Sequence, residues 1–312
     1  MNRNGIGQPV RRVEDQRFLT GRARYVDDIQ LPHMLHGAVV MSPHPHARIK
    51  SISAEEALKT PGVHLVLTGE DAKKEGLGGI PPLFMPEDMG GPKGYRTFRP
   101  LLEPAKARYV GDRIAFVVAD SPELARIAAE KVEIDYEALP AVVSVADAAK
   151  EGAPKVWDDN AAGNLAFPLM MGNKDATDAA FAKAKHTVSV RLYNNRITAN
   201  TLEPRCCIGD FANDSYTLYT SSQNPHGVRG ILAGAVFKFS ETKLRVISPD
   251  VGGGFGMKGD IYPEDGLVLW ASRKLGRPVK WVATRTESLL GDNHGRDQLI
   301  SAEMALDENG KI

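Results

Sequence analysis

The sequence is poor in cysteine. Among its 312 residues only Cys206 and Cys207 are cysteines, and they are adjacent. No CxxC or Cys/His spacing is therefore present to hold zinc or an iron–sulfur cluster. We expect the pair to be two reduced strand residues rather than a disulfide. Any iron–sulfur centre needed for redox chemistry would lie on another chain.

An excess of charge of either sign is also missing. Lys+Arg and Asp+Glu both number 39, so the formal net charge is zero. Binding to a phosphate backbone needs a positive excess or a strong basic patch, so we expect no nucleic-acid partner. No window approaches the ~18 apolar residues of a membrane span. Residues 1–10 lack the apolar core of a secretory signal, and no apolar stretch follows Arg11-Arg12, so a cytoplasmic location is expected.

Short apolar runs separated by turn residues indicate strands and helices in both halves of the chain, and this length favours two domains. In the first half, strands are expected at 35–41, 49–52, 63–67, 114–119 and 132–136, with a long surface loop at 72–104. A helix should begin after Ser121, because Ser121-Pro122-Glu123 offers an N-cap, a first-turn proline and an acid.

After a stretch of Ala, Asp, Gly, Pro and Asn that reads as a linker, a second group of elements is expected. It comprises strands at 187–192, 207–211, 216–221, 244–247, 279–283 and 299–306, and a helix at 263–275. A turn follows at 307–311, and no room remains before Ile312 for a returning strand. We therefore expect an unpaired edge strand at 299–306. Because a finished fold avoids such an edge, we expect the sequence to be a fragment of a longer protein. The alternative is a true terminus whose strand pairs elsewhere.

The most distinctive segment is the glycine loop, defined here as residues 248–258 (SPDVGGGFGMK). It lies between a predicted strand and a predicted helix, an arrangement that commonly binds anions. It fits neither GxxxxGK[ST] nor GxGxxG, which disfavours an ATP or NAD site and a nicotinamide-dependent dehydrogenase. From the local sequence, Phe255 either packs into a core as a wedge or walls a pocket.

GGGFGMK at 252–258 resembles the molybdopterin-loop signature of the molybdenum hydroxylases, the xanthine dehydrogenase/aldehyde oxidase family. Other segments resemble the same family in the expected order: LTGRARYVDDI at 19–29, SPHPHARI at 42–49, RYVGD at 108–112, VEIDYEALP at 132–140, LEPR at 202–205 and SSQNPH at 221–226. Residues 258–263 are closer to the carbon monoxide dehydrogenase-like branch. Each motif is modest alone, but the ordered set covers nearly the whole chain.

The resemblance implies an α+β fold. It divides the chain into an N-terminal arm (1–18), an α/β hammerhead domain (19–145), a linker (146–165) and the first part of a mixed α/β molybdopterin-binding domain (166–312), which we expect to be truncated. The chain would then be part of a large subunit that binds molybdopterin with molybdenum, in the cytosine dinucleotide form. It would hydroxylate a small molecule with oxygen from water.

The same resemblance implies partners and site residues. Electrons would leave through [2Fe–2S] clusters on a small subunit and FAD on a medium subunit, in a dimer of heterotrimers. The residues that would bind the cofactor are Gln223, Gly253, Gly254, Phe255 and Gly256, with no direct protein ligand to the metal. The general-base glutamate is expected beyond residue 312, so no catalytic residue is assigned within the chain.

Other polar residues receive structural roles. Glu203 and Arg205 are expected to form a structural ion pair, and His44, His46 and His226 to be turn or packing residues.

The substrate stays open among carbon monoxide, an aldehyde and an N-heterocycle. Gly259 stands where the xanthine dehydrogenase branch carries a substrate-binding glutamate, which argues against a purine. The alternative function is a non-catalytic fragment, or a binding or assembly protein that retains the fold.

Overall fold

The structure, a computed structural model, describes residue 7 and residues 9–312. Part of the predicted arm at 1–18, and part of the segment inspected for a signal, therefore lie outside the described residues. The first half contains α1 (Asp15–Leu19), η1 (Val26–Asp28), β1 (Leu35–Met41), β2 (Ala47–Ser53), α2 (Glu55–Leu58), β3 (Val63–Thr68), α3 (Gly69–Lys74), η2 (Pro86–Met89), β4 (Lys106–Ala107), β5 (Arg113–Ala119), α4 (Pro122–Ala129), β6 (Glu133–Ala138) and α5 (Val145–Ala148).

The second half contains α6 (Lys174–Lys183), β7 (His186–Asn194), β8 (Cys206–Ala212), β9 (Ser215–Thr220), α7 (Pro225–Ile231), η3 (Leu232–Phe237), η4 (Glu241–Lys243), β10 (Leu244–Ile247), η5 (Met257–Gly259), α8 (Pro263–Leu275), β11 (Val279–Val282), α9 (Arg285–Gly291) and β12 (Gln298–Leu306). The mixture of helices and strands confirms the predicted α+β class. Both cysteines are buried in β8 and free, as predicted.

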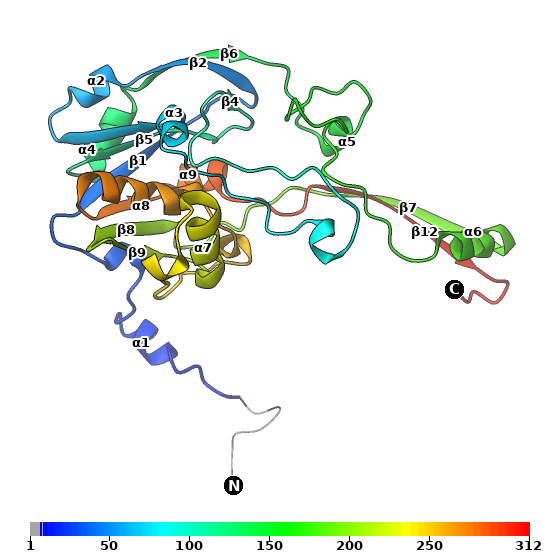
Figure 1. Ribbon diagram of the computed structural model, residues 1–312. Coiled ribbons are helices and arrows are strands. Elements are labelled where there is room, and N and C mark those ends of the chain that lie inside the picture. Colours follow the sequence, from blue (N-terminus) through cyan, green and yellow to red (C-terminus); the bar gives the residue numbers. More distant parts are fainter. Residues whose placement is uncertain (1–6, 8) are drawn as a thin grey trace, which may run out of the picture.

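Seven of the described strands form one mixed sheet, in the order β10-β9-β8-β11-β1-β5-β3. Strands from both halves of the chain meet at its centre, where Leu35 of β1 lies opposite Val279 of β11 in a parallel pair. Figure 1 shows these strands side by side, with α8 lying along them. Phe116, Trp270 and Trp281, each at most 1% exposed, lie in the main core. The core is therefore shared by both predicted domains, whose boundaries stay a prediction.

α8 has the predicted bounds and covers the sheet just after the glycine loop. A proline opens the helix, where a missing N–H costs nothing, and Gly276 follows its last residue in a left-handed conformation at φ 62°. Every residue from Pro263 to Ser272 is buried. The helix thus gives the end of the glycine loop a rigid base.

A second sheet, in the order β4-β2-β6, lies above the first in Figure 1. α4 begins as predicted, because the Ser121 side chain accepts a hydrogen bond from the Leu124 N–H. The predicted loop at 72–104 is mostly irregular, although α3 extends into it and η2 lies within it. The predicted linker at 146–165 contacts the first half of the chain, since the centre of the Trp157 ring lies 3.8 Å from the Arg108 guanidinium carbon.

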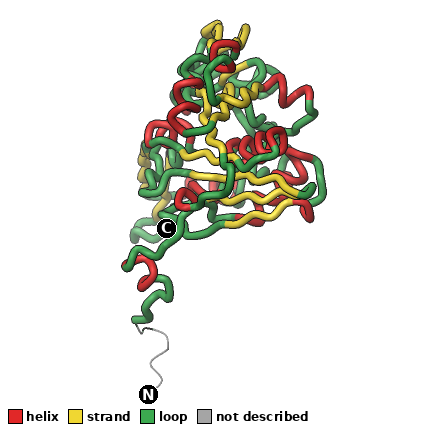
Figure 2. Tube along the Cα trace, turned by 90° about the vertical axis from the view of Figure 1, so that its left-hand side faces the viewer, coloured by secondary structure: helices red, strands yellow, loops and turns green. Residues whose placement is uncertain are grey.

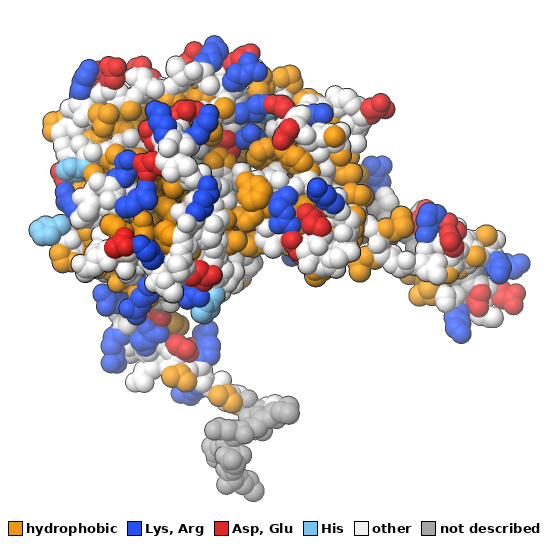
Figure 3. Space-filling model, in the orientation of Figure 1, with side chains coloured by type: hydrophobic (Ala, Val, Ile, Leu, Met, Phe, Trp, Pro, Cys, Tyr) orange, Lys and Arg blue, Asp and Glu red, His pale blue; other side chains and the backbone are white. Residues whose placement is uncertain are grey.

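The expectation of an unpaired strand at 299–306 was wrong. β12 pairs with β7 in an antiparallel ribbon, from Gln298 opposite Asn194 to Leu306 opposite His186. The sequence could not reveal this pairing, because strand partners are chosen by tertiary contacts. The ribbon projects from the body of the molecule with α6 beside it (Figures 1 and 3). None of the described helices combines the length and hydropathy needed to cross a bilayer.

Candidate functional site

The glycine loop leaves β10 and closes through η5 into α8. Three of its residues have positive φ angles: 94° at Gly253, 51° at Phe255 and 90° at Gly256. Glycine adopts this region freely, but for Phe255 the left-handed conformation costs about 1–2 kcal/mol. The surrounding contacts must therefore hold the loop in this shape.

In this conformation several backbone N–H groups of the loop have no partner in the described chain. The turn is closed by the Met257 N–H, which donates to the Gly254 carbonyl at 2.9 Å. Among the described residues, the N–H groups of Gly253, Gly254 and Phe255 form no hydrogen bond. Consecutive N–H groups beside a left-handed residue form a concavity that binds anions or oxygen atoms. We call these three groups the donor row.

Gln223 lies beside the donor row, in the segment between β9 and α7. Its backbone N–H donates to the Lys258 carbonyl at 2.9 Å, and its Oε1 accepts from the Gly256 N–H at 3.1 Å. A Cβ at position 254 would lie 2.4 Å from Gln223 Oε1, so only glycine permits this approach. The structure thus brings Gln223, Gly253, Gly254, Phe255 and Gly256 together, while their binding role stays a prediction.

Phe255 does not pack into a core. It is 81% exposed, so the interpretation of its ring as a wedge inside the described chain was wrong. The ring stands at the surface beside the donor row, where it can wall a site.

The start of the glycine loop is held by two residues near the N-terminus, Arg17 and Arg24. Asp250 accepts from the Arg17 guanidinium at 2.6 Å and from the Arg24 backbone N–H at 2.8 Å. The hydrogen bond from Arg17 lowers the pKa of the Asp250 carboxyl. Figure 2 shows the described N-terminal residues extending away from the body, so the contact with Arg17 joins an outlying segment to the loop.

Glu203 and Arg205 do not pair with each other, which corrects the expected ion pair. Glu203 instead binds Lys258, with Oε2 and Nζ 2.8 Å apart, and accepts from the Gly252 N–H at 2.7 Å. Arg205 donates to Glu264 at 2.8 Å and to Asp292 at 2.6 Å. The two motif residues, separated only by Pro204, therefore belong to two separate clusters.

The Arg205 cluster also contains Arg113, whose Nε donates to Glu264 at 2.8 Å. Burial would raise the pKa of Glu264, but the charges of Arg113 and Arg205 outweigh it and hold that pKa well below its usual range. The Arg205 guanidinium lies 3.8 Å from the centre of the Tyr262 ring, and the Tyr262 hydroxyl donates to the Met257 carbonyl at 2.9 Å. The cluster therefore supports the end of the glycine loop.

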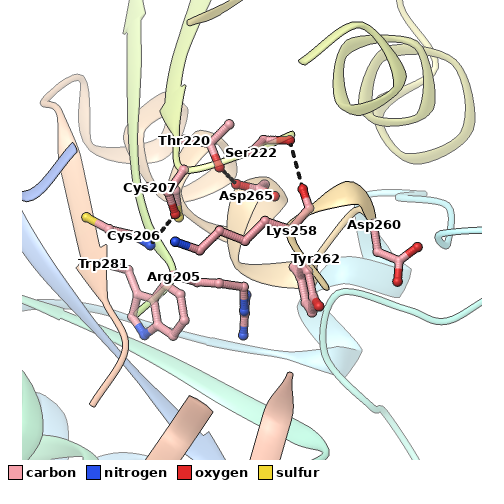
Figure 4. A pocket seen from close by; sticks show the side chains of 11 residues that line it. Arg205, Cys206, Cys207, Thr220, Ser222, Lys258, Asp260, Tyr262, Asp265 and Trp281 are labelled. Atoms are coloured by element: carbon pink, nitrogen blue, oxygen red, sulfur yellow. Dashed lines mark hydrogen bonds between the residues drawn. The ribbon is translucent and has the colours of Figure 1, made fainter. Parts of the chain in front are cut away.

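Behind the loop is a small internal cavity of about 10 Å³, room for a single water molecule. Figure 4 shows Arg205, Lys258 and Asp265 around it. Asp265 accepts from the Thr220 hydroxyl at 2.7 Å, and burial raises its pKa to about 6. Sequence reasoning assigned no role to Asp265, Glu264 or Lys258. For the two acids, the available signal was their position just before the apolar run at 267–271 of the predicted helix.

Two of the three histidines are packing residues, as predicted. His46 is buried with Nδ1 2.7 Å from the Pro140 carbonyl, and the His44 ring contacts Tyr136 with centroids 4.9 Å apart. His226 lies exposed in the first turn of α7. No group of three His, Cys, Asp or Glu side chains suited to a metal ion occurs within the described part of the chain.

Comparison with known families agrees with this geometry. Residues 157–312 match the molybdopterin cofactor-binding domain, and residues 20–140 match the α/β hammerhead domain of aldehyde oxidase and xanthine dehydrogenase. The chain belongs to the aldehyde oxidase and xanthine dehydrogenase family. Its glycine loop therefore lies in the family's molybdopterin cofactor-binding domain.

Several members of this family resemble the chain over nearly its whole length. It is 38% identical to the carbon monoxide dehydrogenase large chain of Hydrogenophaga pseudoflava, over 96% of this chain and 37% of that one. It is 36% identical to the nicotine 6-hydroxylase large subunit of Paenarthrobacter nicotinovorans, over 100% of this chain and 37% of that one. Quinoline 2-oxidoreductase from Pseudomonas putida 86 superposes with a TM-score of 0.88 at 37% identity, over 97% and 37% of the two chains. The chain thus spans little more than a third of these relatives' length.

The residues present fit the family's cofactor. Molybdopterin with molybdenum carries oxygen-rich groups, and the donor row offers N–H groups to such atoms. The side of the loop away from the solvent leaves no room for larger side chains, since a Cβ at Gly252 would lie 2.4 Å from the Glu203 Cβ. The loop is therefore a tight main-chain segment in which the donor row has no hydrogen-bond partner among the described residues.

Proposed function

We propose that this chain is the molybdopterin-binding part of the large subunit of a molybdenum-dependent hydroxylase. The observation that carries the proposal is the donor row beside Gln223, which no described residue satisfies, in a loop of the family's cofactor-binding domain. Backbone strain of this kind clusters at ligand sites, and consecutive N–H groups without a protein partner suit a ligand that carries oxygen atoms.

The residues of this chain would bind and orient the cofactor. The N–H groups of Gly253, Gly254 and Phe255 would donate to oxygen atoms of the metal centre. The Gln223 amide would add a donor without adding charge. The Phe255 ring would exclude water from one side. The bound cofactor would supply the redox chemistry, with water as the oxygen source.

Several further features are proposed from the resemblance alone. They are the cytosine dinucleotide form of the cofactor, an iron–sulfur small subunit, an FAD-containing medium subunit, a dimer of heterotrimers and a cytoplasmic location. The general-base glutamate would lie outside residues 1–312. The relatives named above support a small-molecule substrate, which we leave open among carbon monoxide, an aldehyde and an N-heterocycle.

Metal and pterin analysis of the full-length protein, co-expressed with its neighbouring genes, tests the proposal. We expect stoichiometric molybdenum and pterin in the assembled complex. Gly254→Ala should lower both, because the new Cβ must displace Gln223. Gly234→Ala is the matched control, since a Cβ there meets nothing within 4 Å. A correctly assembled complex without molybdenum would refute the proposal, and cofactor without turnover would favour a binding protein.

A further inference from the structure

Glu203 contacts the glycine loop at two points, Gly252 and Lys258. At the Gly252 end, the Glu203 carboxylate accepts from the Gly252 N–H at 2.7 Å, and the Glu203 N–H donates to the Gly252 carbonyl at 3.2 Å. At the Lys258 end, Nζ donates to the same carboxylate oxygen at 2.8 Å and to the Glu203 carbonyl at 2.9 Å. One residue outside the loop therefore ties its first glycine to its last side chain.

The two side chains are largely removed from solvent. Lys258 is 0% exposed and Glu203 12% exposed at the side chain. Charge-assisted hydrogen bonds in such a setting are strong and directional, whereas a surface ion pair would restrain little. Burial lowers the pKa of Lys258, and the Glu203 carboxylate opposes this effect. Each charge is thus compensated only while the other is present.

The segment between these two ends is the strained one. It contains Gly253, Phe255 and Gly256, all with positive φ, and the three N–H groups of the donor row. A strained turn keeps its shape only when its surroundings over-determine it. Gln223 holds the middle of the turn through Gly256, and Ser222 joins Ser248 to the Lys258 carbonyl. Glu203 and Lys258 add an ionic link from Gly252 to the end of the loop.

We propose that Glu203 and Lys258 are a positioning pair that sets the geometry of the donor row. This inference rests on the proposed function, because the donor row matters as a binding surface only if it receives the cofactor. Neither side chain needs to touch the cofactor. Because the Lys258 ammonium neutralises the Glu203 carboxylate, the pair places no net negative charge near the donor row. The attraction of the donor row for anionic oxygen atoms is therefore not weakened.

The test uses the full-length protein in its native assembly, prepared with the cofactor and, from cells unable to make it, without. Glu203→Gln keeps the side-chain shape and an acceptor for Gly252 but removes the charge. Glu103→Gln is the matched control, since Glu103 is also buried in an ion pair, 2.8 Å from Arg108, and makes no hydrogen bond to the glycine loop. The readouts are hydrogen exchange and paramagnetic resonance.

In the cofactor-free protein, amide exchange in the peptide covering 252–258 should accelerate roughly tenfold to a hundredfold in Glu203→Gln. The amides of Gly256 and Met257 are the informative ones, because Glu203 does not touch them. In the loaded protein, the paramagnetic resonance spectrum of reduced molybdenum should change. Glu103→Gln should leave both readouts as in the wild type.

The double variant Glu203→Gln/Lys258→Met covers the case in which the single variant fails to fold, because it leaves no lone buried charge. A folded double variant with unchanged loop exchange and an unchanged spectrum overturns the inference. Absence of molybdenum from the wild-type complex would instead overturn the proposed function. In that case, amide hydrogen exchange in the cofactor-free protein still decides whether Glu203 and Lys258 fix the conformation of the glycine loop.

Discussion

Asp265 is a buried acid whose replacement should stabilise the protein. It lies in the first turn of α8, it is 6% exposed, and its described side-chain partner is the Thr220 hydroxyl at 2.7 Å. Desolvation, the largest cause, raises its pKa from 3.8 to about 6. Neighbouring Arg205 lowers that pKa but does not cancel the effect, since its hydrogen bonds go to Glu264 and Asp292.

The raised pKa of Asp265 determines how the free energy of unfolding changes with pH. Between pH 4 and 6 the native state holds a proton that the unfolded chain has released, so stability falls as the pH rises through this range. Above pH 6 the native state carries a penalty of about 3 kcal/mol relative to a neutral side chain.

Asp265→Asn removes this penalty, while the amide oxygen of the new side chain still accepts a hydrogen bond from the Thr220 hydroxyl. The adjacent cavity can hold a water for the new NH₂ group.

Thermal unfolding of wild type and Asp265→Asn from pH 4 to 8 measures this effect. We expect the variant to melt about 4 °C higher at pH 8, the shift that this free energy gives in a chain of 312 residues. The difference should vanish near pH 4. A variant that melts lower than wild type at pH 8, or a difference independent of pH, would show that Asp265 is ionised and compensated in the native state.

Three further predictions concern neighbouring features. Glu264→Gln should lower the free energy of unfolding by about 3–5 kcal/mol, because it removes the carboxylate that pairs with two buried guanidinium groups. Denaturant titration at pH 7 measures this loss, and a loss under about 1 kcal/mol would contradict the prediction. Phe255→Gly should raise the unfolding free energy of the cofactor-free protein by up to about 1 kcal/mol, since relief of the left-handed strain exceeds the entropy cost of glycine; a clear loss would show that the ring packs on something. Cys206 and Cys207 should react with a thiol reagent only on unfolding, because burial raises the pKa of both thiols; rapid labelling of the folded protein would disprove this.

Local signals in the sequence predicted individual elements well. The bounds of β1, β10 and α8 agree with the expected ranges, and Ser121 caps α4 as its residue type suggests. Such features depend on residues a few positions apart, so the sequence carries them directly. The positive φ angles of the glycine loop belong to the same class, because only a glycine-rich segment adopts them cheaply.

Long-range partners were not accessible in this way. The sequence placed Glu203 and Arg205 together, whereas each binds a different residue far along the chain. It likewise left β12 without a partner, although β12 pairs along its whole length with β7. A strand with alternating apolar residues needs a neighbouring strand, and a buried charge needs an opposite charge. Many segments and residues of the chain could fill either role, so the sequence alone does not select one.

The sequence by itself thus determined the strand–loop–helix unit, the free cysteines and the family to which the chain is similar. Only the tertiary structure decided that β1 lies beside β11 in a shared sheet, and that the Glu203 carboxylate joins Gly252 to Lys258. The physical reason is range: turns and caps are fixed by neighbours in the chain, whereas sheet order and ion-pair partners are selected by how the whole core packs.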